Sequence, residues 1–145
     1  MFDGCLAGVA RKLAVPLYES RYRRFVQTLH AGRAAQQRWL LERVARCRET
    51  RFGRAHRFSD IRTLSDFRRQ VPIVGYDAIA PYIDAVARGD LEALLPRAER
   101  LVRFTITTGT TGVPKLNPVT ATWLREYCRA WDVWSTKLVL DHPEI

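Results

Sequence analysis

The sequence predicts an α/β protein that is mainly helical, with one or two strands flanking a loop rich in threonine and glycine. Apolar residues recur at every third or fourth position over several long segments, which is the spacing of amphipathic helices. One short segment, Leu101 to Ile106, has the composition of a strand and leads directly into the Thr and Gly cluster. With 145 residues, of which 47 % are apolar, the chain is long and apolar enough to bury a core.

The first two predicted elements are helices. Leu17 to Leu29 has apolar residues at helical spacing, and Gly32 offers a break before a second apolar series that ends at Cys47. The regular pattern then ends in the segment from Thr50 to Phe58. We therefore expect two packed helices followed by an irregular segment.

Two further helices are predicted before the first strand. Thr63 or Ser65 is a suitable N-cap for a short helix around Asp66 to Gln70. From Tyr76 to Arg88 apolar residues recur at intervals of three and four, which favours an amphipathic helix. Gly89 follows at the position where a left-handed C-terminal cap is favoured.

The strands and the last helix surround the Thr and Gly cluster. Leu101 to Ile106 is the first clear strand, and Lys115 to Val119 is expected to form a second, shorter one. Thr120 is placed to cap a long helix from Ala121 to about Leu138. The aromatic residues of this helix share one face and are expected to lie in the core. They are Trp123, Tyr127, Trp131 and Trp134.

Net charge, cysteine spacing and the length of the apolar segments restrict the possible partners of the protein and its cellular location. A formal net charge of +9 favours a polyanionic partner, but the arginines are spread along the predicted helices, as on a solvated basic face. The three cysteines have neither a disulfide-framework nor a zinc-site spacing, and no metal ligands are predicted. No apolar segment approaches the ~20 residues that cross a bilayer, and no signal peptide is evident. We expect a cytoplasmic protein.

The segment from Thr107 to Lys115 carries the predicted chemistry. Gly109 and Gly112 can adopt positive φ and leave backbone N–H groups open to an anion. Threonine hydroxyls add short donors, and Lys115 supplies a positive charge that can reach a phosphate oxygen. Lys115 is the predicted catalytic residue. The predicted phosphate-binding residues are Thr107, Thr108, Gly109, Thr110, Thr111 and Gly112.

This segment is not a Walker loop. Its glycines are separated by two residues rather than four, and its lysine follows Pro114 rather than a glycine. Phosphoryl transfer of the kinase or GTPase type is therefore disfavoured. The alternative at this point is a turn that joins two strands and binds nothing.

Thr107 to Lys115 resembles the signature loop of adenylate-forming enzymes such as acyl-CoA synthetases. Other segments are similar to the N-terminal region of the auxin-responsive acyl-acid amido synthetases of plants and their bacterial relatives. They are Thr50 to Phe58, Asp66 to Arg68, Val71 to Tyr76, Pro81 to Ile83, and Gly89 with Asp90. The resemblance covers roughly residues 33 to 127. The loop departs from the plant pattern, which begins with serines and lacks the Gly-Val-Pro-Lys ending.

The resemblance implies a reaction, its substrates and its site. ATP and magnesium activate a carboxylic acid as an acyl-adenylate with release of pyrophosphate, and the acyl group then passes to the amine of an amino acid. Carried over to this sequence, it assigns residues 108–112 to the ATP phosphates, with Lys115 beside them. It also places Trp123 or Tyr127 near the acyl pocket as a second possibility.

The resemblance further implies that residues 1–145 are the incomplete N-terminal part of a single adenylating domain. The remainder of the parent enzyme, with its adenine pocket and acidic magnesium ligand, is then expected beyond Ile145. The chain alone is expected to lack ligase activity. An acyl-CoA ligase, a basic nucleic-acid module and a helical protein-binding module are the alternatives. Nucleotide binding that depends on Thr108 to Lys115 distinguishes the enzyme from the two binding modules.

Three further residues are assigned structural roles. His56 lies in a basic segment and is expected to hydrogen-bond to the backbone rather than to act in catalysis. Tyr76 and Asp77 are expected to begin a helix rather than to bind substrate, because an aspartate in the first turn is favoured by the helix dipole.

Overall fold

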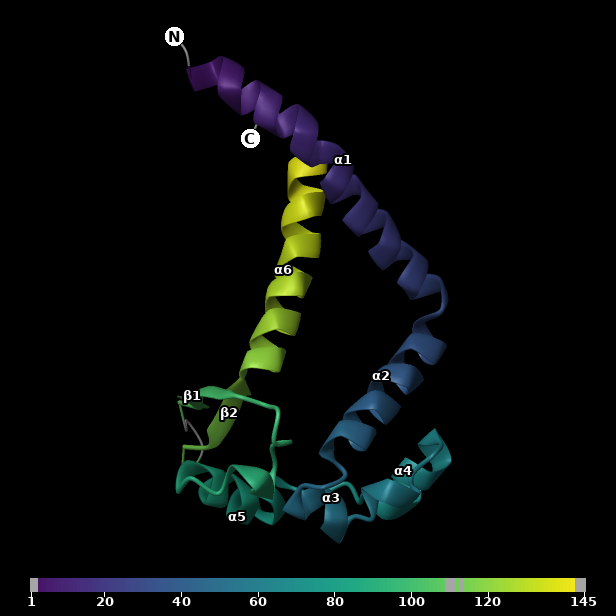
Figure 1. Ribbon diagram of the computed structural model, residues 1–145, viewed down its shortest axis with the longest axis vertical. Coiled ribbons are helices and arrows are strands. Elements are labelled where there is room, and N and C mark those ends of the chain that lie inside the picture. The colour runs from purple at the N-terminus through teal and green to yellow at the C-terminus, as the bar shows by residue number, and fades with distance from the viewer. Residues whose placement is uncertain (1–2, 109–111, 113, 143–145) are drawn as a thin grey trace. The chain divides into compact units, whose positions relative to one another are not determined.

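The computed structural model describes residues 3–108, 112 and 114–142, with side chains from residue 15 onward. These residues are mainly helical and include one two-stranded antiparallel sheet, which confirms the predicted fold class (Figure 1). The α-helices are α1 (Asp3–His30), α2 (Gly32–Cys47), α3 (Arg51–Ala55), α4 (Leu64–Gln70), α5 (Tyr76–Ala87) and α6 (Ala121–Asp141). The strands are β1 (Leu101–Ile106) and β2 (Leu116–Thr120), and the short 3-10 helices are η1 (Phe58–Asp60) and η2 (Leu91–Ala93).

The chain divides into two compact units. The long-helix unit consists of Met1–Ala35 and Arg125–Ile145, and so contains α1 and most of α6. The hairpin unit consists of Gln36–Leu124 and contains α3, α4, α5 and both strands. Among the described residues, none of the helices combines the length and the apolar character that a membrane span requires.

In the long-helix unit, α1 begins at Asp3, well before the apolar series that starts at Leu17. Pro16 lies inside this helix, where it lacks the N–H that would bond to the carbonyl one turn earlier. The break predicted at Gly32 is present, since α1 ends at His30 and α2 begins at Gly32. α1 meets α6 where Lys137 Nζ lies over the ring of Tyr22, 5.8 Å from its centroid.

The aromatic residues of α6 are not in the core, which corrects the sequence prediction. Trp123, Tyr127, Trp131 and Trp134 are between 47 % and 58 % exposed. The rings of Tyr127 and Trp131 lie 6.1 Å apart and those of Trp131 and Trp134 lie 5.3 Å apart, so these rings pack on one another along the helix. Their periodicity correctly predicted a shared face, but periodicity does not reveal whether a face is covered.

Two apolar clusters form the core of the hairpin unit. The first comprises Val44, Phe58 and Ile61. The second comprises Ala85, Val86, Ala93 and Leu95. Phe52 of α3 connects them, because it packs against the first cluster and its ring meets Tyr82 edge-on at 5.3 Å. Tyr82 in turn packs against the second cluster.

α3 is a short helix within Thr50 to Phe58, a segment for which the sequence pattern predicts irregular structure. Thr50 caps it, since its Oγ1 accepts a hydrogen bond from the Gly53 N–H at 2.9 Å and donates one to the Cys47 carbonyl at 2.7 Å. A Cβ on Gly53 would lie 2.0 Å from the Cys47 carbonyl oxygen, so only glycine fits there. The prediction was wrong because a helix of five residues is too short to give a periodic signal.

The next two helices agree with the sequence prediction. Thr63 caps α4 with a capping box: its Oγ1 accepts from the Asp66 N–H at 3.1 Å, and the Asp66 carboxylate accepts from the Thr63 N–H at 2.9 Å. Hydrogen bonding to Thr63, chiefly to its side chain, lowers the pKa of Asp66. α5 begins at Tyr76, and Gly89 follows it with the predicted left-handed conformation, at φ +99°.

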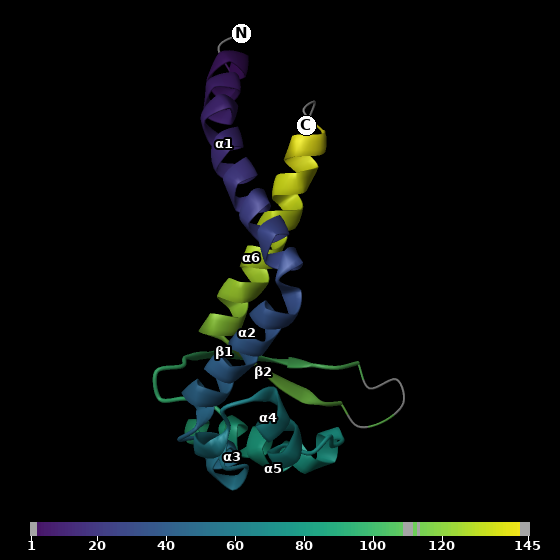
Figure 2. The same cartoon turned by 90° about the vertical axis from the view of Figure 1, so that its right-hand side faces the viewer.

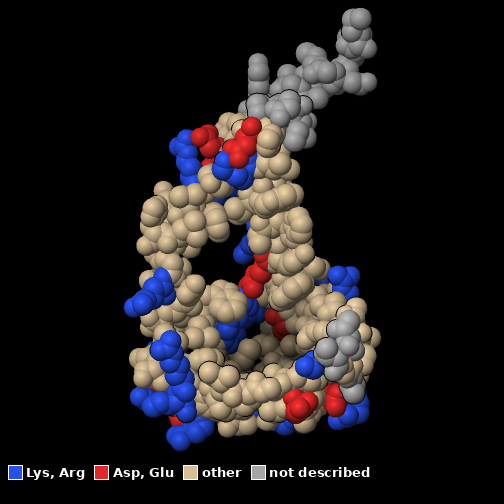
Figure 3. All heavy atoms as spheres, turned by 180° about the vertical axis from the view of Figure 1, so that it is seen from behind, with Lys and Arg blue, Asp and Glu red and all other residues tan. Residues whose placement is uncertain are grey.

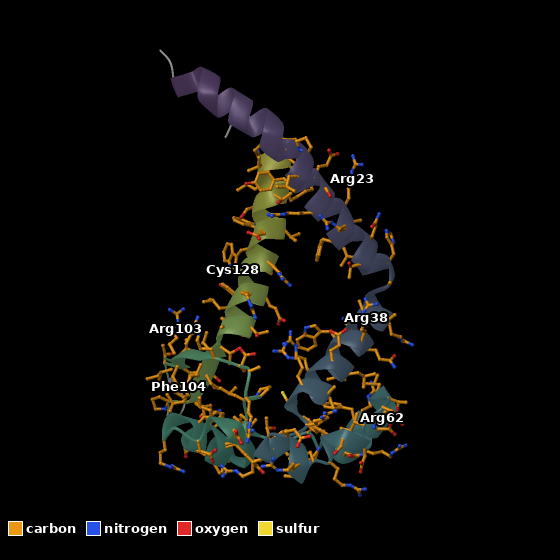
Figure 4. All side chains as sticks on the ribbon, viewed as in Figure 1. Arg23, Arg38, Arg62, Arg103, Phe104 and Cys128 are labelled. Carbon is orange, nitrogen blue, oxygen red and sulfur yellow. The ribbon has the colours of Figure 1, made fainter. Side chains whose placement is uncertain are left out.

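β1 and β2 form an antiparallel hairpin over α5 (Figure 2). β2 begins and ends one residue later than predicted. The pairing register shifts between Leu101 and Arg103, which places a bulge at Val102. Because of this bulge, Leu101 and Phe104 both pack against the cluster on α5. Phe104 points toward α5, whereas Arg103 points away from it (Figure 4).

Candidate functional site

The open end of the hairpin is held by Glu99. The Thr122 N–H donates to Glu99 Oε1 at 3.0 Å, and Arg46 Nη2 donates to Oε2 at 3.2 Å. The carboxylate therefore lies at the N-terminus of α6, where the helix dipole favours a negative charge. Thr120 also caps this helix, as predicted, because its Oγ1 accepts the Trp123 N–H at 3.2 Å.

The pKa of Glu99 lies below the usual range for a glutamic acid. Its side chain is only 7 % exposed, and burial by itself raises the pKa. Hydrogen bonds from Thr122 and Thr120, together with the charge of Arg46, outweigh that effect. Glu99 is thus an ionised, largely buried carboxylate that joins α2, the start of β1 and α6.

The closed end of the hairpin is the neck of the Thr and Gly loop. The Thr107 N–H donates to the Lys115 carbonyl at 3.1 Å, and the Lys115 N–H donates to Thr107 Oγ1 at 3.0 Å. These two bonds extend the pairing by one step beyond Ile106 and Leu116. The predicted catalytic lysine and a predicted phosphate-binding threonine are therefore brought together at one point.

The described residues of the loop are accessible. Thr107, Thr108, Gly112 and Lys115 are all exposed. Among the described residues, a Cβ on Gly112 would meet no atom within 4 Å, so they leave open space beside the backbone at this position. The other predicted phosphate-binding residues, Gly109, Thr110 and Thr111, lie outside the described residues.

Tyr76, the first residue of α5, contacts the exit of the loop. Its hydroxyl accepts a hydrogen bond from the Leu116 N–H at 3.0 Å and donates one to the Leu116 carbonyl at 3.2 Å. Lys115 Nζ lies over its ring, 5.3 Å from the centroid. The sequence correctly predicts that Tyr76 begins a helix, but it does not predict these contacts, because no local pattern signals a partner 40 residues away.

A separate cavity of about 360 Å³ lies beside α3 in the hairpin unit. Its arginines are engaged with partners in the chain: Arg46 with Glu99, Arg97 with Glu92, and Arg54 with the Glu49 carbonyl. Carboxylates compensate the charges of Arg46 and Arg97, whereas Arg54 meets a neutral carbonyl, so only part of the positive charge beside this cavity is available to an anion.

The basic residues on the face of the hairpin unit that Figure 3 shows are spread over more than one part of it. Ion pairs compensate several of them, as between Arg51 and Asp90 at 2.9 Å and between Arg57 and Asp60 at 2.7 Å. In the part of the chain that the structure describes, no group of three or more His, Cys, Asp or Glu side chains could hold a metal ion.

The other residues considered in the sequence have structural surroundings. His56 Nδ1 lies 3.0 Å from the Phe52 carbonyl oxygen, and the two rings stack at 4.1 Å, which confirms the role predicted for this histidine. Cys47 is a partly buried free thiol, and burial raises its pKa. Both residues belong to the packing around α3.

Comparison with known protein families gives a match over most of the chain. Residues 21–144 match the model of the GH3 family N-terminal domain. The matched range includes α2 to α6, both strands, and the neck residues Thr107 and Lys115. No curated protein and no solved structure matches the chain.

Proposed function

We propose that the hairpin loop of this chain binds the phosphates of ATP during the activation of a carboxylic acid. The acyl group then passes to the amine of an amino acid. The proposal starts from the family, since the chain belongs to the GH3 family of auxin-responsive acyl-acid amido synthetases. Membership in this family favours an amide product over a thioester.

The observation that carries the proposal is the neck formed by Thr107 and Lys115. Two hydrogen bonds between Thr107 and Lys115 hold the two ends of the loop together, and the side chains of both residues are exposed. Because Thr107 Oγ1 accepts the Lys115 N–H, the hydrogen of its own hydroxyl is available for donation to a phosphate oxygen. The open space at Gly112 allows close approach of an anion to the backbone.

In the proposed reaction, a carboxylate oxygen attacks the α-phosphorus of ATP. The new oxygen–phosphorus bond forms while the bond from the α-phosphorus to the bridging oxygen breaks, and pyrophosphate leaves with the electron pair. Hydrogen bonds from residues 107–112 and the charge of Lys115 would stabilise the negative charge that develops on the leaving group. The neutral amine of the amino acid then attacks the acyl carbon, the bond from that carbon to the phosphate oxygen breaks, AMP leaves with the electron pair, and the nitrogen loses a proton to solvent.

Magnesium enters this proposal as the ion carried by the ATP phosphates. Proteins usually hold Mg²⁺ through one or two carboxylates together with substrate phosphates and waters. Among the described residues no group of three or more His, Cys, Asp or Glu side chains could hold a metal ion, and we assign no side chain to the magnesium. The role of this chain is to hold the phosphates.

An ATP titration of the purified chain by calorimetry tests the proposal. We expect Lys115→Ala to weaken ATP binding by about tenfold or more, because a hydrogen bond to a charged group contributes about 1.5–3 kcal/mol. Arg103→Ala is the matched control, since it removes an exposed cation from the same hairpin. This control is expected to change the affinity by less than about twofold, because salt screens exposed charges.

Two outcomes contradict the proposal. Equal losses in Lys115→Ala and Arg103→Ala would mean that binding follows net charge, as in a basic module for nucleic acid. Failure of the unsubstituted chain to bind ATP would remove the proposed role of the loop.

A further inference from the structure

At the end of β2 next to the loop, a side chain rather than a neighbouring strand forms hydrogen bonds with the outer backbone groups. An exposed strand edge presents unpaired N–H and C=O groups, which usually need a partner or water. At Leu116, both of these groups bond to the hydroxyl of Tyr76, at 3.0 Å and 3.2 Å. One hydroxyl thus fixes the backbone of β2 at its first residue, immediately after Lys115.

The ring of the same tyrosine contacts the predicted catalytic side chain. Lys115 Nζ lies 5.3 Å from the centroid of the Tyr76 ring, within the range of a cation–π interaction. An aromatic face orients an ammonium group without neutralising it, in contrast to a carboxylate. The lysine is therefore held in place with its charge available to a phosphate.

The helix that carries Tyr76, α5, is well packed. Tyr76 is the first residue of α5, and the buried side chains of this helix include Ile83 and Val86. Val86 is only 1 % exposed and belongs to the cluster that also contacts Leu101 and Phe104 of β1. A group attached to this helix therefore has a fixed position relative to the hairpin.

We propose that Tyr76 is a positioning residue that fixes the exit of the loop and the ammonium group of Lys115 for phosphate binding. The hydroxyl positions the backbone at Leu116, and the ring positions Lys115. This inference rests on the proposed function of the loop, and its structural part is testable without nucleotide.

Two substitutions separate the hydroxyl from the ring. Tyr76→Phe keeps the ring and removes both hydrogen bonds to Leu116, so amide exchange at Leu116 should rise by about tenfold. Exchange at Val86 should be unchanged, and the NMR shifts of the Lys115 side chain should retain the upfield displacement caused by the ring. Tyr76→Leu should remove the protection of Leu116 and that displacement together.

Tyr82→Phe is the matched control, because it removes a tyrosine hydroxyl from the same helix while keeping the ring that packs on the core. It should leave the exchange of Leu116 unchanged. In the ATP titration, Tyr76→Phe should weaken binding by about threefold to tenfold, because both hydrogen bonds to Leu116 are lost, and Tyr76→Leu should weaken it by more, because the ring is lost as well. Tyr82→Phe should match the unsubstituted chain.

The outcomes distinguish this inference from the proposed function. Unchanged Leu116 exchange in Tyr76→Phe, or equal increases at Leu116 and Val86, would overturn the positioning role, because the second result indicates general destabilisation of α5. Faster Leu116 exchange with unaltered ATP affinity would also overturn it. If the unsubstituted chain does not bind ATP, the proposed function fails, and the proposed role of Tyr76 in phosphate binding fails with it. The exchange data then still show whether the Tyr76 hydroxyl fixes the backbone of β2.

Discussion

Threonine and glycine have opposite uses in α3 and in the loop between the strands. At α3, Thr50 is 3 % exposed and its hydroxyl makes two hydrogen bonds within the chain, while a Cβ on Gly53 would clash with backbone. In the loop, Thr108 is exposed and a Cβ on Gly112 would meet nothing within 4 Å. The same residue types stabilise the fold in one region and leave donors and space available in the other.

This difference predicts that stability and binding can be changed separately. Substitutions around α3 and at the open end of the hairpin should lower the free energy of unfolding. Substitutions in the loop should leave it almost unchanged and lower the affinity for nucleotide.

Gly53→Ala is expected to have the largest effect on stability. The new Cβ would lie 2.0 Å from the Cys47 carbonyl oxygen, so the backbone of α3 or of the end of α2 must shift. We expect the free energy of unfolding, measured with urea, to fall by about 3 kcal/mol or more. Gly112→Ala is the matched control and should change it by less than about 0.5 kcal/mol. Similar effects of the two substitutions would break the comparison.

Glu99→Gln is expected to have the next largest effect, and this effect depends on pH. The carboxylate is largely buried, but Arg46 is 44 % exposed and solvent screens that ion pair. We therefore expect a loss of about 1–2 kcal/mol at neutral pH, mainly from the weaker hydrogen bonds at the start of α6.

The sign of the pH dependence follows from the lowered pKa of Glu99. The stabilisation is complete above about pH 4.3, the ordinary pKa of a glutamic acid, and is lost as the pH falls through the lower pKa of the folded state. The difference in the free energy of unfolding between the original chain and Glu99→Gln should therefore shrink in acid. A difference that stays constant down to about pH 2 would contradict the assigned role.

Thr50→Ala is expected to cost about 1–2 kcal/mol, because it removes the N-cap of α3 and leaves the Gly53 N–H without its acceptor. Thermal unfolding followed by circular dichroism measures the change. Thr108→Ala is the corresponding substitution in the loop and should not alter the midpoint by more than experimental error. A lower midpoint in Thr108→Ala would mean that the loop is also part of the structural framework.

Substitutions in the loop should have the smallest effects on stability but a measurable effect on ATP binding. For Thr108→Ala and Gly112→Ala we expect the ATP affinity to fall by about threefold to tenfold, since each change removes a donor or adds a methyl group beside the bound phosphates. Calorimetric titration of the same protein samples measures this change. Unaltered affinity in both variants would restrict the site to Lys115 and Thr107.

Sequence patterns predicted the elements that have a strong local signal. An N-cap at Thr63 or Ser65, the left-handed Gly89 and the cap at Thr120 are short-range signals of element ends, and the structure has the first at Thr63 and both of the others. The apolar series before the Thr and Gly cluster likewise predicted β1 within the observed limits.

The features that could not be predicted depend on tertiary contacts. α3 is too short for periodicity, and the exposure of Trp131 and Trp134 depends on whether another surface covers α6. At the candidate site, the sequence supplied Thr107 and Lys115 through their composition and spacing. The contacts of Tyr76 with Lys115 and Leu116 could not be predicted, because they arise only when α5 packs under the hairpin.

The central claim is that the loop between β1 and β2 binds the phosphates of ATP. Its most direct test is an ATP titration of the isotopically labelled chain in which the NMR shifts of the backbone amides are measured. We predict that the largest shift changes fall within residues 107–116, with a smaller change at Tyr76 and none at the arginines of α4. Shift changes spread over Arg68, Arg69 and other basic positions, with none in the loop, would contradict the account.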